Sequence, residues 1–268
     1  MALFFNFHFC SRVENQWIFS KGKYAFTVVF RTVRLNESYI NTEAVKTTDD
    51  WCVGSVIAPT WIVTVASCLP TEENTIILIL MREKSFSDVK EIYTEHYYPH
   101  QLYEKNSSNE YYYDVGLIET RSRLKFSDYL HTVRMSKYIM AERTYYIISA
   151  NLFGPLNFYT FGIQPCPEVV TVRYEDSICV SPSGLFSLPN IHMGSAVISD
   201  GVMYGLIVLN INDSLFRNSY CLVVPTNTFF SWANERIPYL LSISSHWNVC
   251  NSLFNILLVH NIFYIVTL

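Results

Sequence analysis

The sequence contains little glycine and little charge. It has 9 glycines in 268 residues, about 3% against a usual ~7%, and 16% charged residues against a usual ~25%. Few charges and 50% hydrophobic residues argue against disorder, and the length suits one large domain or two small ones. The formal net charge of −4 argues against a nucleic-acid-binding surface or a polybasic membrane patch, so no nucleic-acid partner is expected.

Metal-binding spacings are also missing. No Cys-x-x-Cys pair and no Cys/His cluster of zinc spacing occurs, so neither a metal nor a cofactor is expected. The 7 cysteines are then disulfide-bonded or scattered thiols, and their odd number leaves at least one without an intrachain partner. Asn-x-Ser sequons at Asn36, Asn106 and Asn212 favour the secretory route and predict glycosylation there. We therefore expect an extracellular protein.

Both ends of the chain are apolar. Residues 1–11 are interpreted as a leader or a degenerate signal, since the stretch is short and lacks a basic start. Residues 239–268 form a hydrophobic tail, whose last 16 residues would span roughly 24 Å as a helix, less than the ~30 Å of a bilayer core. The tail is a cleaved lipid-anchor signal, a strand packed on the core, or sequence outside the mature protein. A membrane contact is expected only if this tail anchors the chain.

Aromatic and β-branched residues are abundant, with 19 Tyr and 18 Phe. Such residues favour strands, and strand-like runs occur throughout the chain, at residues 24–33, 52–58, 61–66, 75–81, 111–119, 145–150, 168–173, 196–199, 202–210 and 220–224. Pro59-Thr60 separates two of these runs and is typical of a turn. Many short strands with turns between them predict an all-β sandwich or barrel.

One helix is expected near the end, over residues 227–237. Thr226 or Asn227 can cap its N-terminus, and Pro238 favours its end. Its apolar residues share one face at helical spacing: Phe229, Trp232, Ala233 and Ile237.

Three segments and this helix resemble the trypsin-like serine protease family (peptidase S1). Residues 51–68 match the segment Cys-Gly-Gly-Ser-Leu-Ile … Trp-Val-Leu-Thr-Ala-Ala-His-Cys in order and spacing. Residues 112–118 resemble the strand Asn-Asp-Ile-Ala-Leu-Ile, and residues 192–202 fall where the family has Asp-Ser-Gly-Gly-Pro-Leu-Val-Cys-x-Gly. The resemblance, nearest to arthropod-type members, implies two antiparallel six-stranded β-barrels and a C-terminal helix. The implied domain covers residues 12–238, with barrels at about 12–122 and 123–238.

The resemblance also assigns the family's catalytic positions. Asp114 falls on the triad carboxylate, but Ser67 stands in place of the histidine base and Met193 in place of the nucleophile. A thioether has no proton to lose, and a hydroxyl is no useful base near neutral pH. We expect Asp114 to hydrogen-bond to Ser67 or to backbone instead.

Neighbouring residues offer no obvious rescue. His192 takes the position of the aspartate that receives the new amino terminus, and we expect it to be a packed or hydrogen-bonded residue rather than a base. Ser195 could act as nucleophile only after a register shift, which would still leave Ser67 where the base belongs. Cleavage after Arg12 would free an amine that His192 cannot pair with.

The implied oxyanion and pocket positions are altered as well. Ile191 replaces the glycine that supplies an oxyanion donor, Ser187 falls at the base of the specificity pocket, and Asn210 replaces a glycine on the pocket wall. Pro189 replaces a disulfide cysteine. Part of the glycine scarcity is thus explained by losses at positions where the family's chemistry needs bare backbone.

By the same resemblance, Cys52–Cys68 and Cys166–Cys179 should be disulfides and Cys221 a leftover thiol, while the partners of Cys10 and Cys250 stay open.

Three hypotheses follow. In the first, the chain is a secreted homologue that has lost catalysis and binds a protease, an inhibitor or a protease substrate as decoy, cofactor or regulator. In the second, it is a working serine-type endopeptidase whose sequence is misjoined at the triad segments. In the third, the tail makes it a membrane-tethered structural protein.

Overall fold

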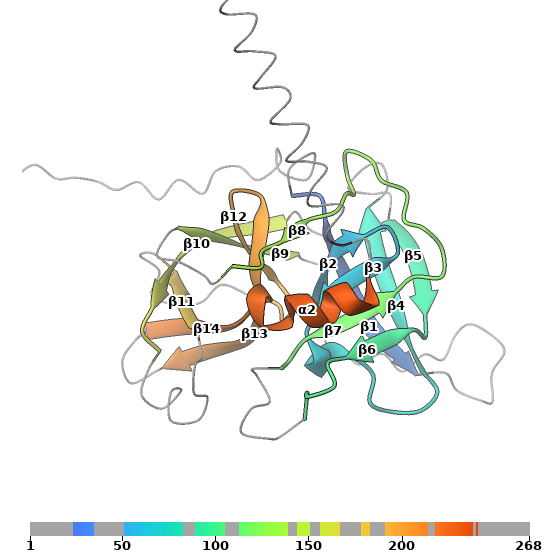
Figure 1. The fold of residues 1–268 in the computed structure, drawn as a ribbon, viewed down its shortest axis with the longest axis horizontal. Coiled ribbons are helices and arrows are strands. Elements are labelled where there is room, and N and C mark those ends of the chain that lie inside the picture. The colour runs from blue at the N-terminus through green and yellow to red at the C-terminus, as the bar shows by residue number, and fades with distance from the viewer. Residues whose placement is uncertain are drawn as a thin grey trace, which may run out of the picture.

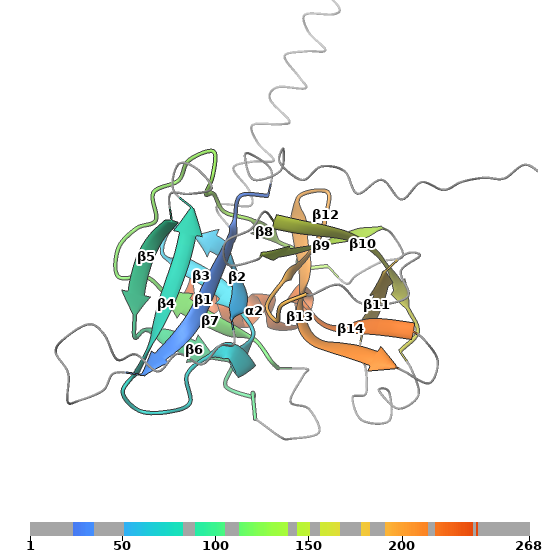
Figure 2. The ribbon, with the colours of Figure 1, turned by 180° about the vertical axis from the view of Figure 1, so that it is seen from behind.

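The computed structural model describes residues 24–34, 51–82, 89–104, 113–138, 144–150, 156–166, 178–182, 191–213, 218–237 and 240. These residues form two β-sheets side by side, and one helix lies across the front of both (Figure 1). The reverse view shows the same separation, with β1 and β4 on one side and β10, β11 and β14 on the other (Figure 2). The change of sheet falls between β7 (Gly116–Glu119) and β8 (Arg134–Met135).

The first sheet has seven strands in the order β5-β4-β1-β2-β3-β7-β6. Its other members are β1 (Thr27–Arg34), β2 (Cys52–Ala58), β3 (Trp61–Thr64), β4 (Thr75–Arg82), β5 (Val89–Thr94) and β6 (Tyr97–Pro99). Pro59-Thr60 turns the chain between β2 and β3, where Ala58 pairs with Trp61, as predicted.

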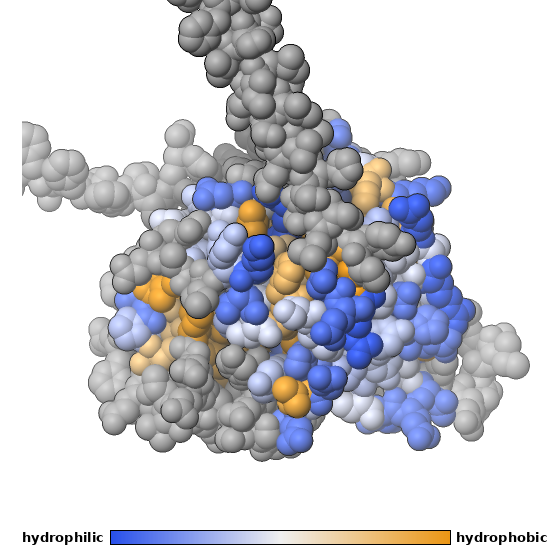
Figure 3. Space-filling model, in the orientation of Figure 1, coloured by the Kyte–Doolittle hydropathy of each residue, from blue (hydrophilic) through white to orange (hydrophobic). Residues whose placement is uncertain are grey.

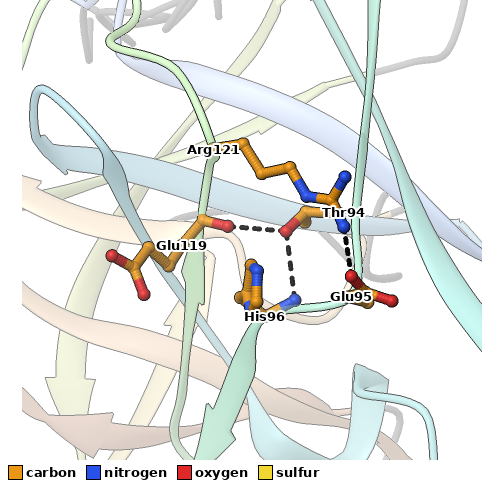
Figure 4. A network of polar contacts seen from close by, with 5 residues as sticks. All are labelled: Thr94, Glu95, His96, Glu119 and Arg121. Atoms are coloured by element: carbon orange, nitrogen blue, oxygen red, sulfur yellow. Dashed lines mark hydrogen bonds and ion pairs between the residues drawn. The ribbon is translucent and has the colours of Figure 1, made fainter.

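The two edge strands of this sheet, β5 and β6, are consecutive in sequence, so the sheet curls back on itself at the corner between them. Polar contacts fasten this corner to the end of β7 (Figure 4). The hydroxyl of Thr94 donates to the carbonyl of Glu119 at 2.7 Å and accepts from the His96 amide at 3.1 Å, while Glu95 forms an ion pair with Arg121. The first sheet is therefore a half-barrel whose two edge strands meet at this corner, and the expected all-β architecture of two barrel-like sheets with a C-terminal helix is confirmed.

The second sheet closes on itself. Its strands run β12-β9-β10-β11-β14-β13, and β12 also pairs with β13, which makes a six-stranded barrel with β8 added in parallel to β13. The members are β9 (Tyr145–Ala150), β10 (Leu156–Gln164), β11 (Ile178–Pro182), β12 (Ala196–Ser199), β13 (Val202–Asp213) and β14 (Asn218–Pro225). Asp200 and Gly201, both at positive φ, make the two-residue turn between β12 and β13 that an Asp-Gly pair favours.

The predicted strands are largely confirmed, with some differences. The run 61–66 stops at Thr64 and continues as a short 3-10 helix η2 (Ala66–Cys68), and the run 111–119 is strand only from Gly116. Strands β5, β6, β8, β10 and β11 were not predicted, and the run at 168–173 lies outside the described residues.

Helix α2 (Thr226–Arg236) lies where it was predicted, and its apolar face is buried as expected: Phe229, Trp232, Ala233 and Ile237. The predicted cap is wrong. Pro225 is the N-cap, and its ring has no polar atom for a side-chain capping bond. Thr226 is already helical, and its hydroxyl donates to the Ser136 carbonyl at 2.6 Å. That buried bond ties the helix start to the segment that follows β8.

The face that carries α2 is mainly hydrophilic over the first sheet (Figure 3). In the part of the chain that the structure describes, no helix is both long enough and apolar enough to cross a membrane. The leader, the tail apart from Leu240, and the sequons at Asn36 and Asn106 lie outside the described residues. Asn212 lies in β13 opposite Ser219.

Candidate active site

Ser67 and Asp114 meet because two neighbouring strands place them together. Thr64 at the end of β3 pairs with Gly116 at the start of β7, so the residues just beyond these ends share one edge. The buried Asp114 carboxylate accepts two bonds from Ser67, from the amide at 2.7 Å and from the hydroxyl at 2.8 Å. The predicted contact is confirmed, and the Ser67 hydroxyl proton points to the carboxylate.

Met193 lies in the turn before β12, and the residue is 36% exposed. Its carbonyl accepts the Val53 amide at 2.9 Å, which fixes this turn to β2 in the first sheet. Met193 and Ser67 line the same hollow. The structure thus brings together the two residues that the resemblance places at the positions of the histidine base and the nucleophile, and these residues carry a hydroxyl and a thioether.

Ser195 and His192 are engaged elsewhere. Ser195 is fully buried and its hydroxyl donates to the His192 carbonyl at 2.6 Å. The half-buried His192 ring is hydrogen-bonded to the Trp51 backbone, and burial lowers its pKa below the usual value despite that bond. His192 is therefore a packed, hydrogen-bonded residue, as expected, and the Ser195 hydroxyl is not presented to a substrate.

A hydrogen bond joins the Asn210 side chain in β13 to the backbone of Ile191, which precedes β12. The Asn210 side-chain amide donates from Nδ2 to the Ile191 carbonyl at 2.5 Å, and the buried Oδ1 of Asn210 has no hydrogen-bond partner. The Ile191 side chain packs into the core cluster of this barrel. Since the resemblance places both residues at the pocket and oxyanion positions, a side-chain bridge lies where the family keeps glycine backbone. Ser187 and Pro189 lie outside the described residues.

Cys221 lies on the neighbouring strand β14, directly opposite Asn210 of β13. It is a free, fully buried thiol, and burial raises its pKa to about 12. A thiol with so high a pKa is an inert packing group. Cys10 and Cys250 lie outside the described residues.

Both predicted disulfides, Cys52–Cys68 and Cys166–Cys179, are present. The first holds η2, and with it Ser67, to the start of β2. Within the described ranges, no group of three or more His, Cys, Asp or Glu side chains could hold a metal ion.

Sequence reasoning missed Arg31 and Arg34, which line the same hollow as Ser67 and Met193. The local sequence shows two arginines in β1, a strand that is otherwise mostly apolar. It does not predict which surroundings their side chains have in the fold.

Comparison with known proteins agrees with this architecture. Residues 32–150 match the family model described as Trypsin, a range that includes Ser67 and Asp114 but ends before Met193. A search of the curated proteins gives no match. The match is a similarity to the trypsin family over these residues, and the two disulfides and the two-sheet architecture with its C-terminal helix give the chain a trypsin-like fold.

Proposed function

We propose that this chain is a secreted serine protease homologue without catalytic activity, which acts by binding a protease, an inhibitor or a protease substrate as decoy, cofactor or regulator. The observation that carries the proposal is the pairing of Ser67 with Asp114. In the triad mechanism the carboxylate orients an imidazole, which then takes the proton of the nucleophile. Here both Ser67 donors occupy the carboxylate, so it has no base to orient.

The residues at and beside the position of the nucleophile also support a protein without catalytic activity. Met193 cannot form an acyl-enzyme, and the hydroxyl closest to it in the sequence, that of Ser195, is buried and donates to a backbone carbonyl. Loss of either base or nucleophile costs on the order of 10⁶ in turnover in a well-measured enzyme of another fold. The Asn210–Ile191 bridge would also hinder a substrate side chain from entering.

Labelling and turnover test the loss of catalysis. The full chain, produced through a secretory host, is treated with a fluorophosphonate probe and a panel of fluorogenic peptides, with active trypsin as positive control. We expect no labelling and no turnover above heat-treated protein. Labelling that disappears in Ser195→Ala would refute the proposal.

A restoration variant makes the test sharper. Ser67→His/Met193→Ser rebuilds the triad by residue type but leaves Ile191, His192 and Asn210 in place. We expect it to gain no measurable turnover, because the oxyanion and pocket positions stay altered. Turnover by this double variant would show that only two side chains separate the chain from an enzyme.

The alternative, a serine-type endopeptidase with a misjoined sequence, is tested directly on the transcript. The retained Asp114 geometry is the feature that favours it. Codons for histidine at position 67 and serine at position 193 would establish this alternative. Secretion and glycosylation are tested by a glycosidase-dependent mobility shift of the secreted protein, lost in Asn36→Gln/Asn106→Gln/Asn212→Gln.

A further inference from the structure

Tyr93 is an exposed tyrosine on an edge strand of the first sheet. The residue is 51% exposed and belongs to β5, which stands at one end of the strand order. An edge strand offers an extended backbone and a row of main-chain donors and acceptors, so another protein can bind alongside it. The Tyr93 phenol is therefore a group that a modifying enzyme can reach.

Carboxylates flank Tyr93 on both sides. Glu91 precedes it by two residues, Glu95 follows it by two, and both are exposed. The Tyr93 hydroxyl donates to the Glu91 carboxylate at 2.9 Å, so the phenolic oxygen itself lies in this acidic, exposed environment. An enzyme that transfers an anionic group holds that group with arginine and lysine, and an acceptor between carboxylates complements such a basic site.

The other exposed tyrosines of the described residues lack this environment. They are Tyr138 and Tyr146, which are 69% and 40% exposed. Neither has an Asp or Glu within two residues in the sequence, and the Lys137 amine lies over the Tyr138 ring, 5.6 Å from its centroid. Exposure is thus common to three tyrosines, whereas flanking carboxylates distinguish Tyr93.

Arg31 lies on the same face of the sheet as Tyr93. The register pairs Arg31 with Leu78 and Leu78 with Tyr93, so the three side chains form one row across β1, β4 and β5. The hydrogen bond to Glu91 raises the pKa of Tyr93, and the charge of Arg31 is near enough to oppose that rise. The buried Arg31 Nε has no hydrogen-bond partner. An anion added at Tyr93 would therefore meet a cation on its own face, which offsets part of the added charge.

We propose that Tyr93 is sulfated on its phenolic oxygen by a sulfotransferase of the secretory route. The inference rests on the proposed function, which sends the chain along that route, and the two disulfides are typical of proteins that fold in an oxidising compartment. It goes beyond that function, because it places a permanent negative charge on the open edge of the first sheet, where a partner can bind.

The step balances with a nucleotide phosphosulfate as the donor. The phenolic oxygen of Tyr93 attacks the sulfur, and the new O–S bond replaces the bond between sulfur and the phosphate oxygen of the donor. The nucleotide phosphate leaves with that electron pair, and the phenolic proton passes to a base of the transferase. Nothing is oxidised or reduced.

Mass spectrometry of the secreted full chain tests the proposal. The peptide that contains Tyr93 is fragmented under conditions that preserve sulfate esters, so the modified tyrosine is identified directly. We expect sulfate on Tyr93, its loss in Tyr93→Phe, and its retention in Tyr138→Phe. Chlorate, which blocks synthesis of the donor, should remove the modification. A phosphate would instead persist in chlorate and be removed by alkaline phosphatase.

Paired substitutions test the role of the carboxylates. Glu91→Gln/Glu95→Gln should lower the sulfated fraction by about tenfold or more, the range of a charge-assisted hydrogen bond. Glu72→Gln/Glu73→Gln makes the same change in net charge at two other exposed positions of the first half of the chain, and it should change that fraction by less than about twofold. Secreted yield and circular dichroism show that each variant folds.

Unmodified Tyr93 in the secreted chain, a phosphate in place of the sulfate, or an equal sulfated fraction on Tyr138 or Tyr146 would overturn the proposal. An equal loss of sulfate in the two double variants would overturn it as well. Fluorophosphonate labelling of the same preparation separates this inference from the proposed function. A labelled protein with sulfate on Tyr93 refutes the loss of catalysis alone, whereas an unlabelled secreted protein without sulfate refutes the modification alone.

Discussion

Replacement of Ser67 by alanine tests whether the hydrogen bond between its hydroxyl and Asp114 stabilises the fold. The variant keeps the backbone amide that donates to one oxygen of Asp114 and removes only the hydroxyl that donates to the other at 2.8 Å. Because Asp114 is fully buried, water cannot easily replace the lost donor.

The expected cost follows from the charge of the acceptor. A hydrogen bond to a charged group contributes about 1.5–3 kcal/mol, more than a bond between neutral groups. For a chain of about this length, 1 kcal/mol shifts Tm by about 2–4 °C, so Ser67→Ala should melt roughly 3–12 °C lower. Asp114→Asn should cost about as much, because it replaces two charge-assisted hydrogen bonds by neutral ones, in which Oδ1 accepts the Ser67 amide and Nδ2 donates to the Ser67 hydroxyl oxygen. The double variant should cost clearly less than the sum of the two.

Urea unfolding and calorimetry with the disulfides intact measure these differences. Ser122→Ala, at an exposed serine in the loop after β7, is the matched control and should stay within about 0.5 kcal/mol of the parent. If Ser67→Ala also stays within that margin, or if the two single changes are additive, the hydroxyl does not stabilise the buried carboxylate and the reasoning fails.

Three further predictions concern the same region. Gly194→Ala should prevent folding, since Gly194 lies at φ +82° and a Cβ would stand 1.9 Å from the Val53 carbonyl oxygen. Gly162→Ala, whose Cβ would lie 3.7 Å from the side-chain nitrogen of Gln164, should fold normally, and the yield of secreted protein and the Tm distinguish the two variants. Burial, with a smaller contribution from Arg236, lowers the pKa of His100, so the free energy of unfolding should be highest above about pH 6.5 and fall as the pH drops below that value. In urea titrations, His100→Phe should reduce this pH dependence, whereas His96→Gln at an exposed position should leave it unchanged. Cys221, with a pKa of about 12, should resist iodoacetamide at pH 8 in the folded protein and react in urea, as peptide mapping would show; rapid native labelling would contradict its burial.

The local pattern of apolar and β-branched residues was sufficient to predict the strands whose residues are mostly buried. The run Cys52–Ala58 is wholly buried and was predicted with its bounds. Strand β5 was not, because Val89–Thr94 is a mostly polar edge strand whose side chains alternate between exposed and partly buried positions. The helix was found from its apolar face, but its cap depends on Ser136, a residue distant in sequence that no local signal connects to Thr226.

Some contacts of the candidate site were also predicted from the sequence, and others were not. The contact of Ser67 with Asp114 was foreseen because the resemblance places both residues on known positions. The bond from Asn210 to Ile191 was not, although both residues had been singled out, because it depends on how a turn meets a strand. The packing of the Arg31 guanidinium over the Trp51 ring depends on the pairing of β1 with β2, and no local sequence pattern predicts it.

The turn at Met193 joins the two halves of the molecule. Val53 in the first sheet donates to the Met193 carbonyl, Thr64 donates to the Val53 carbonyl, and the Gly194 amide donates to Ile207 in the second sheet. Main-chain atoms carry the connection between the two sheets at residues 193 and 194, and the side chain of Met193 takes no part in these bonds. The identity of that side chain can therefore change without breaking the connection between the sheets.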